Sequence, residues 1–186
     1  LEQIKTLSPA TEGRAYVDTG PVLERDYASR SGLGWFGKHT NLIGIRSGSW
    51  FFIGELILTT ELEPDPPATD HCGTCTKCID ACPTDAILEP YVLDSNRCIS
   101  YLTIELKGPI PKDLREAVGN WVYGCDVYQD VCPWNKKQAR PTSEPAFRSR
   151  EGFERPALHD LLSLDPSAFS TRFRKSPVKR TKRRGL

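Results

Sequence analysis

Four cysteines within eleven residues constrain this chain more than any other feature of its sequence. In the segment CGTCTKCIDACP they are Cys72, Cys75, Cys78 and Cys82, and Pro83 follows directly. The spacing C-x2-C-x2-C-x3-C-P is typical of ligands to [4Fe–4S] clusters, in which the first three thiolates bind one cluster and the fourth binds another. Zinc is the alternative, but zinc sites rarely place four cysteines so densely before a proline. The segment therefore predicts two iron–sulfur clusters.

The remaining cysteines complete most of this ligand set. Counting back from Cys132 in GCDVYQDVCPWN, the same spacing requires cysteines at 128 and 125, yet position 128 is Tyr128. Cluster 1 is predicted to bind Cys72, Cys75, Cys78 and Cys132. Cluster 2 is predicted to bind Cys82, Cys98 and Cys125, without a fourth thiolate. The fourth position could take Tyr128 as a phenolate, Asp126 or solvent; otherwise the site could hold a three-iron cluster or no cluster at all.

Composition restricts where such a chain could work. Seven cysteines are an odd number, and their short gaps suit a metal better than disulfides, so a reducing, cytoplasmic location is expected. There is no apolar run of about 18 residues and no basic leader, so neither a membrane span nor secretion is predicted. The chain lacks methionine and starts at Leu1, so we expect it to be part of a longer protein.

The net charge of +1 hides a strong asymmetry. Residues 1–165 carry 17 basic and 24 acidic side chains, whereas the segment after Asp165 carries eight basic side chains and no acidic one. A basic block of this kind predicts an anion-binding surface, and nucleic acid is the commonest such anion. A solvated, disordered tail is the alternative.

Local patterns predict short elements of both kinds. Strands are expected at 14–18, 41–46 and 50–58, a proline-rich linker at 63–69, and helices at 22–31, 95–106, 112–118, 157–163 and 166–173. The loop GLGWFGKH at 32–39 matches phosphate-binding patterns only superficially. A helix precedes it and a strand follows it, and His39 stands where a P-loop needs a hydroxyl. Lys38, His39, Thr40 and Asn41 could instead meet a large flat cofactor, although a structural turn is an equal alternative.

Several long motifs resemble members of the epoxyqueuosine reductase family. They are VDTGPVLERDYASRSGLGWFGKHTNLI (17–43), CGTCTKCIDACPTDAI (72–87), RCISYLTIE (97–105), YGCDVYQDVCPWN (123–135) and FRKSPVKRTKRRGL (173–186). The resemblance implies a cytoplasmic enzyme with cobalamin and two [4Fe–4S] clusters that reduces epoxyqueuosine to queuosine in the tRNA anticodon loop. It also implies an upstream segment that completes the cobalamin domain and a downstream helical-repeat region.

The resemblance assigns roles residue by residue. Asp18 matches the proposed proton donor, and it would need burial against the corrin and the aromatic side chains of Trp35 and Phe36 to raise its pKa. The seven cysteines match cluster ligands, and Tyr128 stands where the family normally has cysteine. Ser100 joins Lys38, His39, Thr40 and Asn41 as a candidate cofactor contact. The candidate contacts to the tRNA backbone are Lys175, Lys179, Arg180, Lys182, Arg183 and Arg184.

The expected architecture is α+β with three parts. Residues 1–66 are predicted to form part of a cobalamin-binding reductase domain, residues 67–138 a ferredoxin-like two-cluster domain, and residues 139–186 a basic helical extension that binds tRNA. An external electron donor, no membrane partner and a monomer are expected. The alternatives are a ferredoxin-type electron-transfer module without catalysis and a corrinoid reductase of small molecules.

Overall fold

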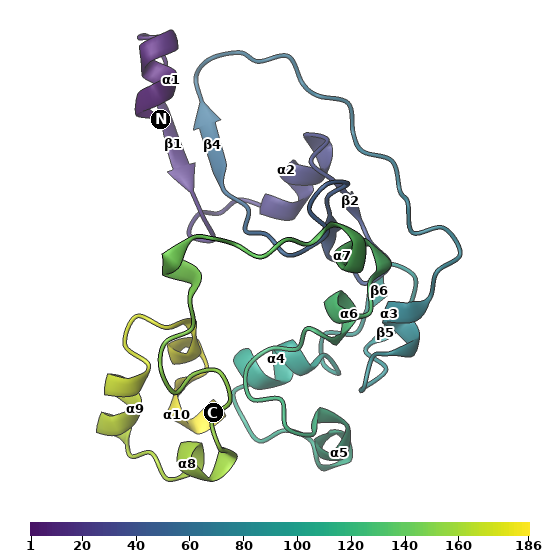
Figure 1. Ribbon diagram of the computed structural model, residues 1–186, viewed down its shortest axis with the longest axis vertical. Helices are drawn as coiled ribbons and strands as arrows, with labels where there is room; N and C mark the ends of the chain where they lie inside the picture. Colours follow the sequence, from purple (N-terminus) through teal and green to yellow (C-terminus); the bar gives the residue numbers. More distant parts are fainter.

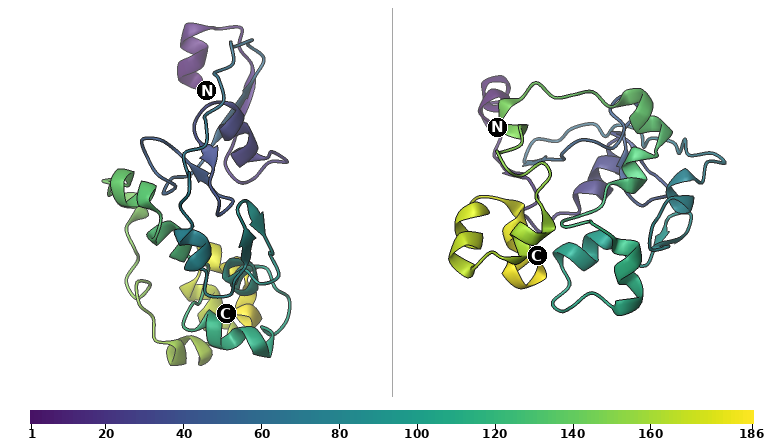
Figure 2. Two further views of the ribbon diagram at one scale, coloured as in Figure 1. Left: turned by 90° about the vertical axis from the view of Figure 1, so that its right-hand side faces the viewer. Right: turned by 60° about the horizontal axis from the view of Figure 1, so that its bottom comes forward.

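The buried apolar side chains of this chain pack in three small clusters instead of one large core. The computed structural model describes residues 1–186, of which 28 are buried. The N-terminal elements lie at one end of the molecule and the C-terminal helices at the other, with the cysteine-bearing segments beside them (Figures 1 and 2). None of the helices is both long enough and apolar enough to span a bilayer.

A two-stranded ribbon projects from the N-terminal end (Figure 1). Helix α1 (Glu2–Leu7) precedes strand β1 (Gly13–Tyr16), which pairs antiparallel with β4 (Glu55–Leu58). The strand predicted at 50–58 is therefore much shorter than expected. The first half of the apolar run leaves the ribbon, and the Phe52 ring stacks on Phe147 with centroids 5.3 Å apart. Apolar composition alone did not distinguish pairing from this side-chain contact.

The segment between these strands turns toward the cysteines. Helix α2 (Glu24–Arg30) lies within the predicted 22–31, and the two-residue strands β2 (Trp35–Phe36) and β3 (Leu42–Ile43) form a tight hairpin. A side chain at Gly34 would collide with the backbone carbonyl of Ile43, so glycine permits the close approach. As expected, a helix precedes the glycine-rich loop and a strand follows it, which is the reverse of a dinucleotide-binding loop.

The cysteine region is built from short helices and one hairpin. In chain order its elements are α3 (Lys77–Asp80), β5 (Ile87–Glu89), β6 (Val92–Leu93), α4 (Ile99–Ile104), η1 (Lys112–Leu114), α5 (Arg115–Val118), α6 (Val127–Asp130) and α7 (Pro133–Gln138). Helix α4 is shorter than the predicted 95–106 because Cys98 occupies its N-cap position. A small core of Ile99, Leu102, Leu114 and Val118 packs α4 against η1 and α5, and Cys125 lies against it.

The C-terminal segment folds into its own helical cluster. Its elements are η2 (Pro145–Phe147), α8 (Leu158–Leu162), α9 (Pro166–Arg172), η3 (Pro177–Arg180) and α10 (Lys182–Gly185). Asp165 caps α9, and Leu161, Phe169 and Phe173 form the core. The Tyr123 hydroxyl donates to the Pro177 carbonyl at 2.8 Å, and Arg180 pairs with Glu105 at 2.7 Å. These contacts attach the cluster to the cysteine region.

Candidate iron–sulfur centres and basic groove

Cysteines from two segments line a first pocket. Its volume is 160 Å³, and its thiols are those of Cys72, Cys75, Cys78 and Cys132. Cys72 and Cys75 come from the loop that leads into α3, Cys78 lies in α3 itself, and Cys132 is the N-cap residue of α7. The buried Cys132 also packs with Trp35 and Ile43 of the β2–β3 hairpin. The structure thus brings together the four thiols that the sequence assigned to cluster 1.

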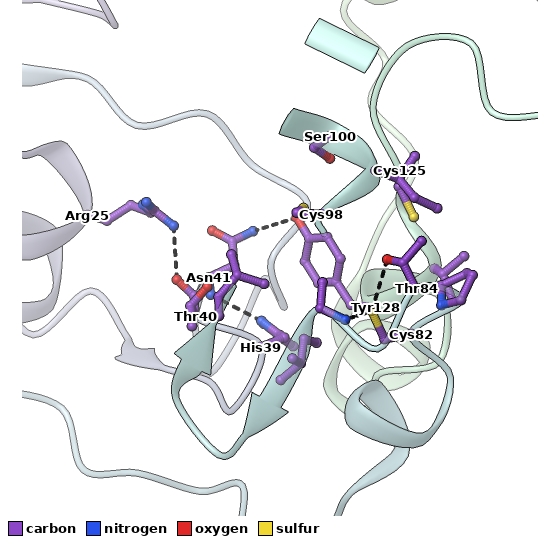
Figure 3. Close-up of a pocket in the computed structure, with 16 residues that line it drawn as sticks. Arg25, His39, Thr40, Asn41, Cys82, Thr84, Cys98, Ser100, Cys125 and Tyr128 are labelled. Atoms are coloured by element: carbon purple, nitrogen blue, oxygen red, sulfur yellow. Dashed lines mark hydrogen bonds between the residues drawn. The ribbon is translucent and has the colours of Figure 1, made fainter. Parts of the chain in front are cut away.

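A second pocket collects the other three cysteines. Its volume is 210 Å³, and Cys82, Cys98, Cys125 and Tyr128 all line it (Figure 3). The backbone N–H of Ala86 donates to the Cys82 sulfur at 3.2 Å. Both pockets are smaller than the roughly 300–1,000 Å³ typical of sites for organic ligands. They suit a compact inorganic group, and the second pocket offers it three thiols and a phenol.

The state of the thiols also bears on what they can hold. Burial raises the pKa of Cys78 to about 11 and also raises the pKa values of Cys72 and Cys125. A metal must displace these protons, so cluster formation would release them to solvent. No three His, Cys, Asp or Glu side chains converge on one point as a single ion requires. Zinc would need sulfurs at about 2.3 Å from one centre, whereas a four-iron cluster holds its thiolates farther apart.

The loop at residues 33–49, here called the hub loop, holds the first pocket from the N-terminal side. The Lys38 ammonium is buried and donates to the carbonyls of Gly73 at 2.7 Å and Cys75 at 3.0 Å. Farther along, the Ser49 N–H donates to the side-chain oxygen of Asn135 at 2.5 Å, and the Asn135 amide donates to the Ser49 hydroxyl at 2.8 Å. The hub loop therefore fixes both the first cysteine loop and the helix that follows Cys132.

The same loop forms one wall of the second pocket. His39, Thr40 and Asn41 line it together with Ser100 and Arg25, whose guanidinium donates to the Thr40 carbonyl at 2.9 Å. Four of the five predicted cofactor contacts thus lie at this pocket, and Lys38 lies at the other. Lys38 uses its charge on backbone carbonyls, a role that sequence reasoning missed because its partners lie about 35 residues away.

Two buried N–H groups of the hub loop have no hydrogen-bond partner in the protein. They are the indole Nε1 of Trp35 and Nε2 of His39, whose Nδ1 accepts from the Asn41 N–H at 3.2 Å. Burial lowers the pKa of His39 to about 4, so its ring is neutral near pH 7. Trp35 packs against Cys72 and Cys132, and His39 lines both pockets. Buried donors rarely stay unpaired, and cluster sulfurs would be acceptors for these two, so the residues fit the group.

Asp18 does not line either cysteine pocket. It follows β1 in a bend, has a left-handed φ of 53°, and its side chain is exposed. In the chain alone neither Trp35 nor Phe36 covers this carboxyl, and the buried Trp35 ring packs edge-on against His71 and Trp134, at 4.9 Å in each case. The strained backbone is the remaining local signal that this position is unusual.

A basic groove lies between the C-terminal cluster and the end of α4. Its volume is 580 Å³, and the residues that line it are Leu106, Lys107, Gly108, Pro109, Thr181, Lys182, Arg184 and Gly185. All six predicted tRNA contacts are exposed, but three are also engaged within the chain. Arg180 pairs with Glu105, Arg183 donates to the Leu164 carbonyl and Lys179 to the Ser170 hydroxyl. Lys107 joins the basic residues only in three dimensions, so sequence reasoning missed it.

Comparisons with known proteins show what the chain is similar to. Residues 71–135 match the family described as a 4Fe-4S double cluster binding domain. The epoxyqueuosine reductase of Cellulophaga algicola is 52% identical over 174 residues, which cover 94% of this chain and 56% of that protein. The crystal structure of selenomethionine-labelled epoxyqueuosine reductase superposes with a TM-score of 0.90 at 34% identity, covering 99% of this chain and 48% of that one.

A second solved structure is similar to the same extent. It is an epoxyqueuosine reductase with an epoxyqueuosine-modified tRNA-Tyr stem loop, and it matches with a TM-score of 0.84 at 35% identity, covering 96% of this chain and 49% of that one. The chain thus spans about half the length of the relatives it matches. The match supports a mixed α+β chain with a ferredoxin-like double-cluster domain.

Proposed function

Because the chain belongs to the epoxyqueuosine reductase family, we propose that it carries the electron-transfer part of an enzyme that reduces epoxyqueuosine to queuosine in the tRNA anticodon loop. The observation that supports this most is the sorting of seven cysteines into two pockets on either side of the hub loop. Two adjacent one-electron centres suit a reaction that consumes two electrons. An external donor would reduce them.

Removal of an epoxide oxygen also requires protons and a reactive centre. Cobalamin, when bound, would supply a cobalt that can act as a strong reductant or nucleophile. The predicted contacts that lie at the second pocket are His39, Thr40, Asn41 and Ser100. Because 210 Å³ is small for an organic ligand, these residues would meet one edge of a corrin and do not enclose it.

Asp18 remains the proposed proton donor to the departing oxygen. Since the side chain is exposed here, a covering substrate or cofactor would have to shield it from water before Asp18 acts as a general acid. Its left-handed backbone holds the carboxyl at a turn, away from the β1–β4 pairing.

The basic groove is the proposed site for the tRNA backbone. Lys107, Lys182 and Arg184 line it, and none of the three forms an ion pair within the chain. Phosphate contacts of this kind supply affinity and salt dependence without reading the base sequence. Lys175, Lys179, Arg180 and Arg183 would extend the surface around the groove. Tyr123 connects this surface to Cys125 two residues along the chain.

Charge reversal in the groove tests this surface. The double variant K182E/R184E should weaken binding of a tRNA stem loop and reduce the slope of log K against log salt by about 2, since each lost phosphate contact removes about 1. K112E is the matched control, because Lys112 is exposed and lies outside the groove. Equal losses in both variants, or an unchanged slope, would contradict the groove as the tRNA site.

Reaction and cofactor are tested separately. The cluster-loaded chain, supplied anaerobically with cobalamin, a chemical reductant and an epoxyqueuosine stem loop, should form queuosine, and D18N should abolish the product while the variant chain keeps its iron.

The ferredoxin-like module is the second candidate, supported by the family match that covers residues 71–135 alone. It predicts reducible clusters but no change in the visible spectrum of added cobalamin. That result would reject the reductase proposal for this chain.

A further inference from the structure

The second pocket offers no thiolate for the fourth ligand position of a cluster, and the structure restricts which other group could bind there. Cys82, Cys98 and Cys125 all line the pocket, and Tyr128, three residues after Cys125, lines it from α6. Each iron of a four-iron cluster needs a terminal ligand, and three thiolates serve three irons. The question is therefore whether any other donor can reach the remaining iron.

Asp126 does not provide that donor. Its side chain is exposed and does not line the pocket, and its carboxylate accepts a hydrogen bond from the Gln129 amide at 2.9 Å. His39 does line the pocket, but its ring packs against the Tyr128 ring and its Nδ1 already accepts a hydrogen bond from the Asn41 N–H. Neither the acidic nor the imidazole side chain is thus placed to complete the ligand set.

The hydroxyl oxygen of Tyr128 lies farther from the backbone than the sulfur of a cysteine at this position would. A cysteine sulfur lies one bond from Cβ, whereas the phenol oxygen lies at the far end of a rigid ring. That ring packs against His39 with centroids 5.0 Å apart, and its hydroxyl accepts a hydrogen bond from Asn41 Nδ2 at 3.4 Å. This is the hydroxyl's one hydrogen bond, and it points the oxygen at the hub loop (Figure 3). The ring lines the same pocket as the three thiols, so its bulk takes up space that a smaller cysteine side chain would leave free.

We propose that the second site holds a three-iron cluster bound by Cys82, Cys98 and Cys125, with the non-ligating ring of Tyr128 filling the vacant corner. The ligand count then balances, because three irons take three thiolates and the four sulfides remain shared among them. This inference rests on the second cluster site of the proposed function. It is independent of cobalamin, tRNA and turnover, so its failure would be distinguishable from failure of the reductase proposal.

Iron counts and spectroscopy on the full chain, reconstituted anaerobically with iron and sulfide, provide the test. We expect about seven irons per chain, four from the first site and three from the second. The oxidised protein should show the spin-half EPR signal of a three-iron cluster at about one spin per chain. About eight irons with an EPR-silent oxidised state would overturn the proposal, and so would about four irons, which would mean an empty second site.

Two variants distinguish a Tyr128 ring that only fills space from a Tyr128 oxygen that binds iron. Y128F keeps the ring and removes the oxygen, so iron count and EPR signal should match those of the unaltered chain. Loss of iron or of a phenolate-to-iron charge-transfer band in Y128F would show that the oxygen binds iron and would overturn the proposal. Y128C supplies the missing thiolate and should raise the count to about eight irons and remove the spin-half signal. A count unchanged in Y128C would also contradict the inference.

Discussion

The first cysteine pocket takes four thiols from two segments, whereas the second takes three thiols from three segments and a tyrosine. The first is also held by a buried lysine on its backbone and by the Ser49–Asn135 pair behind it. At the second, the hub loop reaches the ligand positions through one long hydrogen bond, from Asn41 to Tyr128 at 3.4 Å, and the Cys82 sulfur accepts from the Ala86 N–H. Ligand number and supporting contacts thus differ in the same direction, and we expect the first cluster to be the more firmly retained.

Loss of one ligand from each pocket should have the largest effect. C132S should remove about four irons and leave the EPR signal of the second site, whereas C98S should remove the second cluster and leave the first. The reason is that each pocket draws on a separate set of thiols. Iron analysis with EPR measures both. Simultaneous loss of both clusters in each variant would show that the pockets do not assemble independently.

Removal of the lysine should have an intermediate effect. K38M loses two charge-assisted hydrogen bonds to the first cysteine loop, each worth roughly 1.5–3 kcal/mol. We expect faster release of iron from the first site to a chelator, with the rate at the second site unchanged. K77M is the control, because Lys77 lines the same pocket but is exposed. Similar release rates in K38M and K77M would show that the two Lys38 hydrogen bonds do not help to retain the first cluster.

Removal of the orphan indole donor should have the smallest effect. In W35F the aromatic packing on Cys72 and Cys132 remains, but the buried N–H is gone. A hydrogen bond to a cluster sulfur stabilises the reduced, more negative state, so its loss should lower the reduction potential. A bond of about 1 kcal/mol corresponds to about 40 mV for one electron. Redox titration should show this shift at the first cluster, and an equal shift at the second would contradict it.

The cysteine sets could be sorted from sequence because their spacing is local. Thiols two or three residues apart must share a loop, and the Cys-Pro pair at 132–133 also marks a helix start, since Pro133 is the first residue of α7. The assignment of each thiol to a cluster stays a prediction until metal is measured. The structure places the two predicted sets in two pockets, and the family profile covers the whole region.

The supporting contacts could not be predicted, because they join residues far apart in the chain. Lys38 reaches Gly73, and Ser49 reaches Asn135, across loops whose course no local pattern specifies. Lys107 joins Lys182 and Arg184 only after the C-terminal cluster folds back. The contacts of Trp35 could not be predicted for the same reason, since its partners His71 and Trp134 lie far along the chain in the cysteine region.

The hub loop changes what the proline-rich segment at 63–69 means for this molecule. That segment is almost wholly exposed, and a protease could cut it, yet Lys38, Asn41 and Ser49 would still bind residues on the other side of the cut. The two resulting fragments would stay associated. Conversely, a polypeptide that started after the cut would carry every thiol and still lack the inner lining of both pockets.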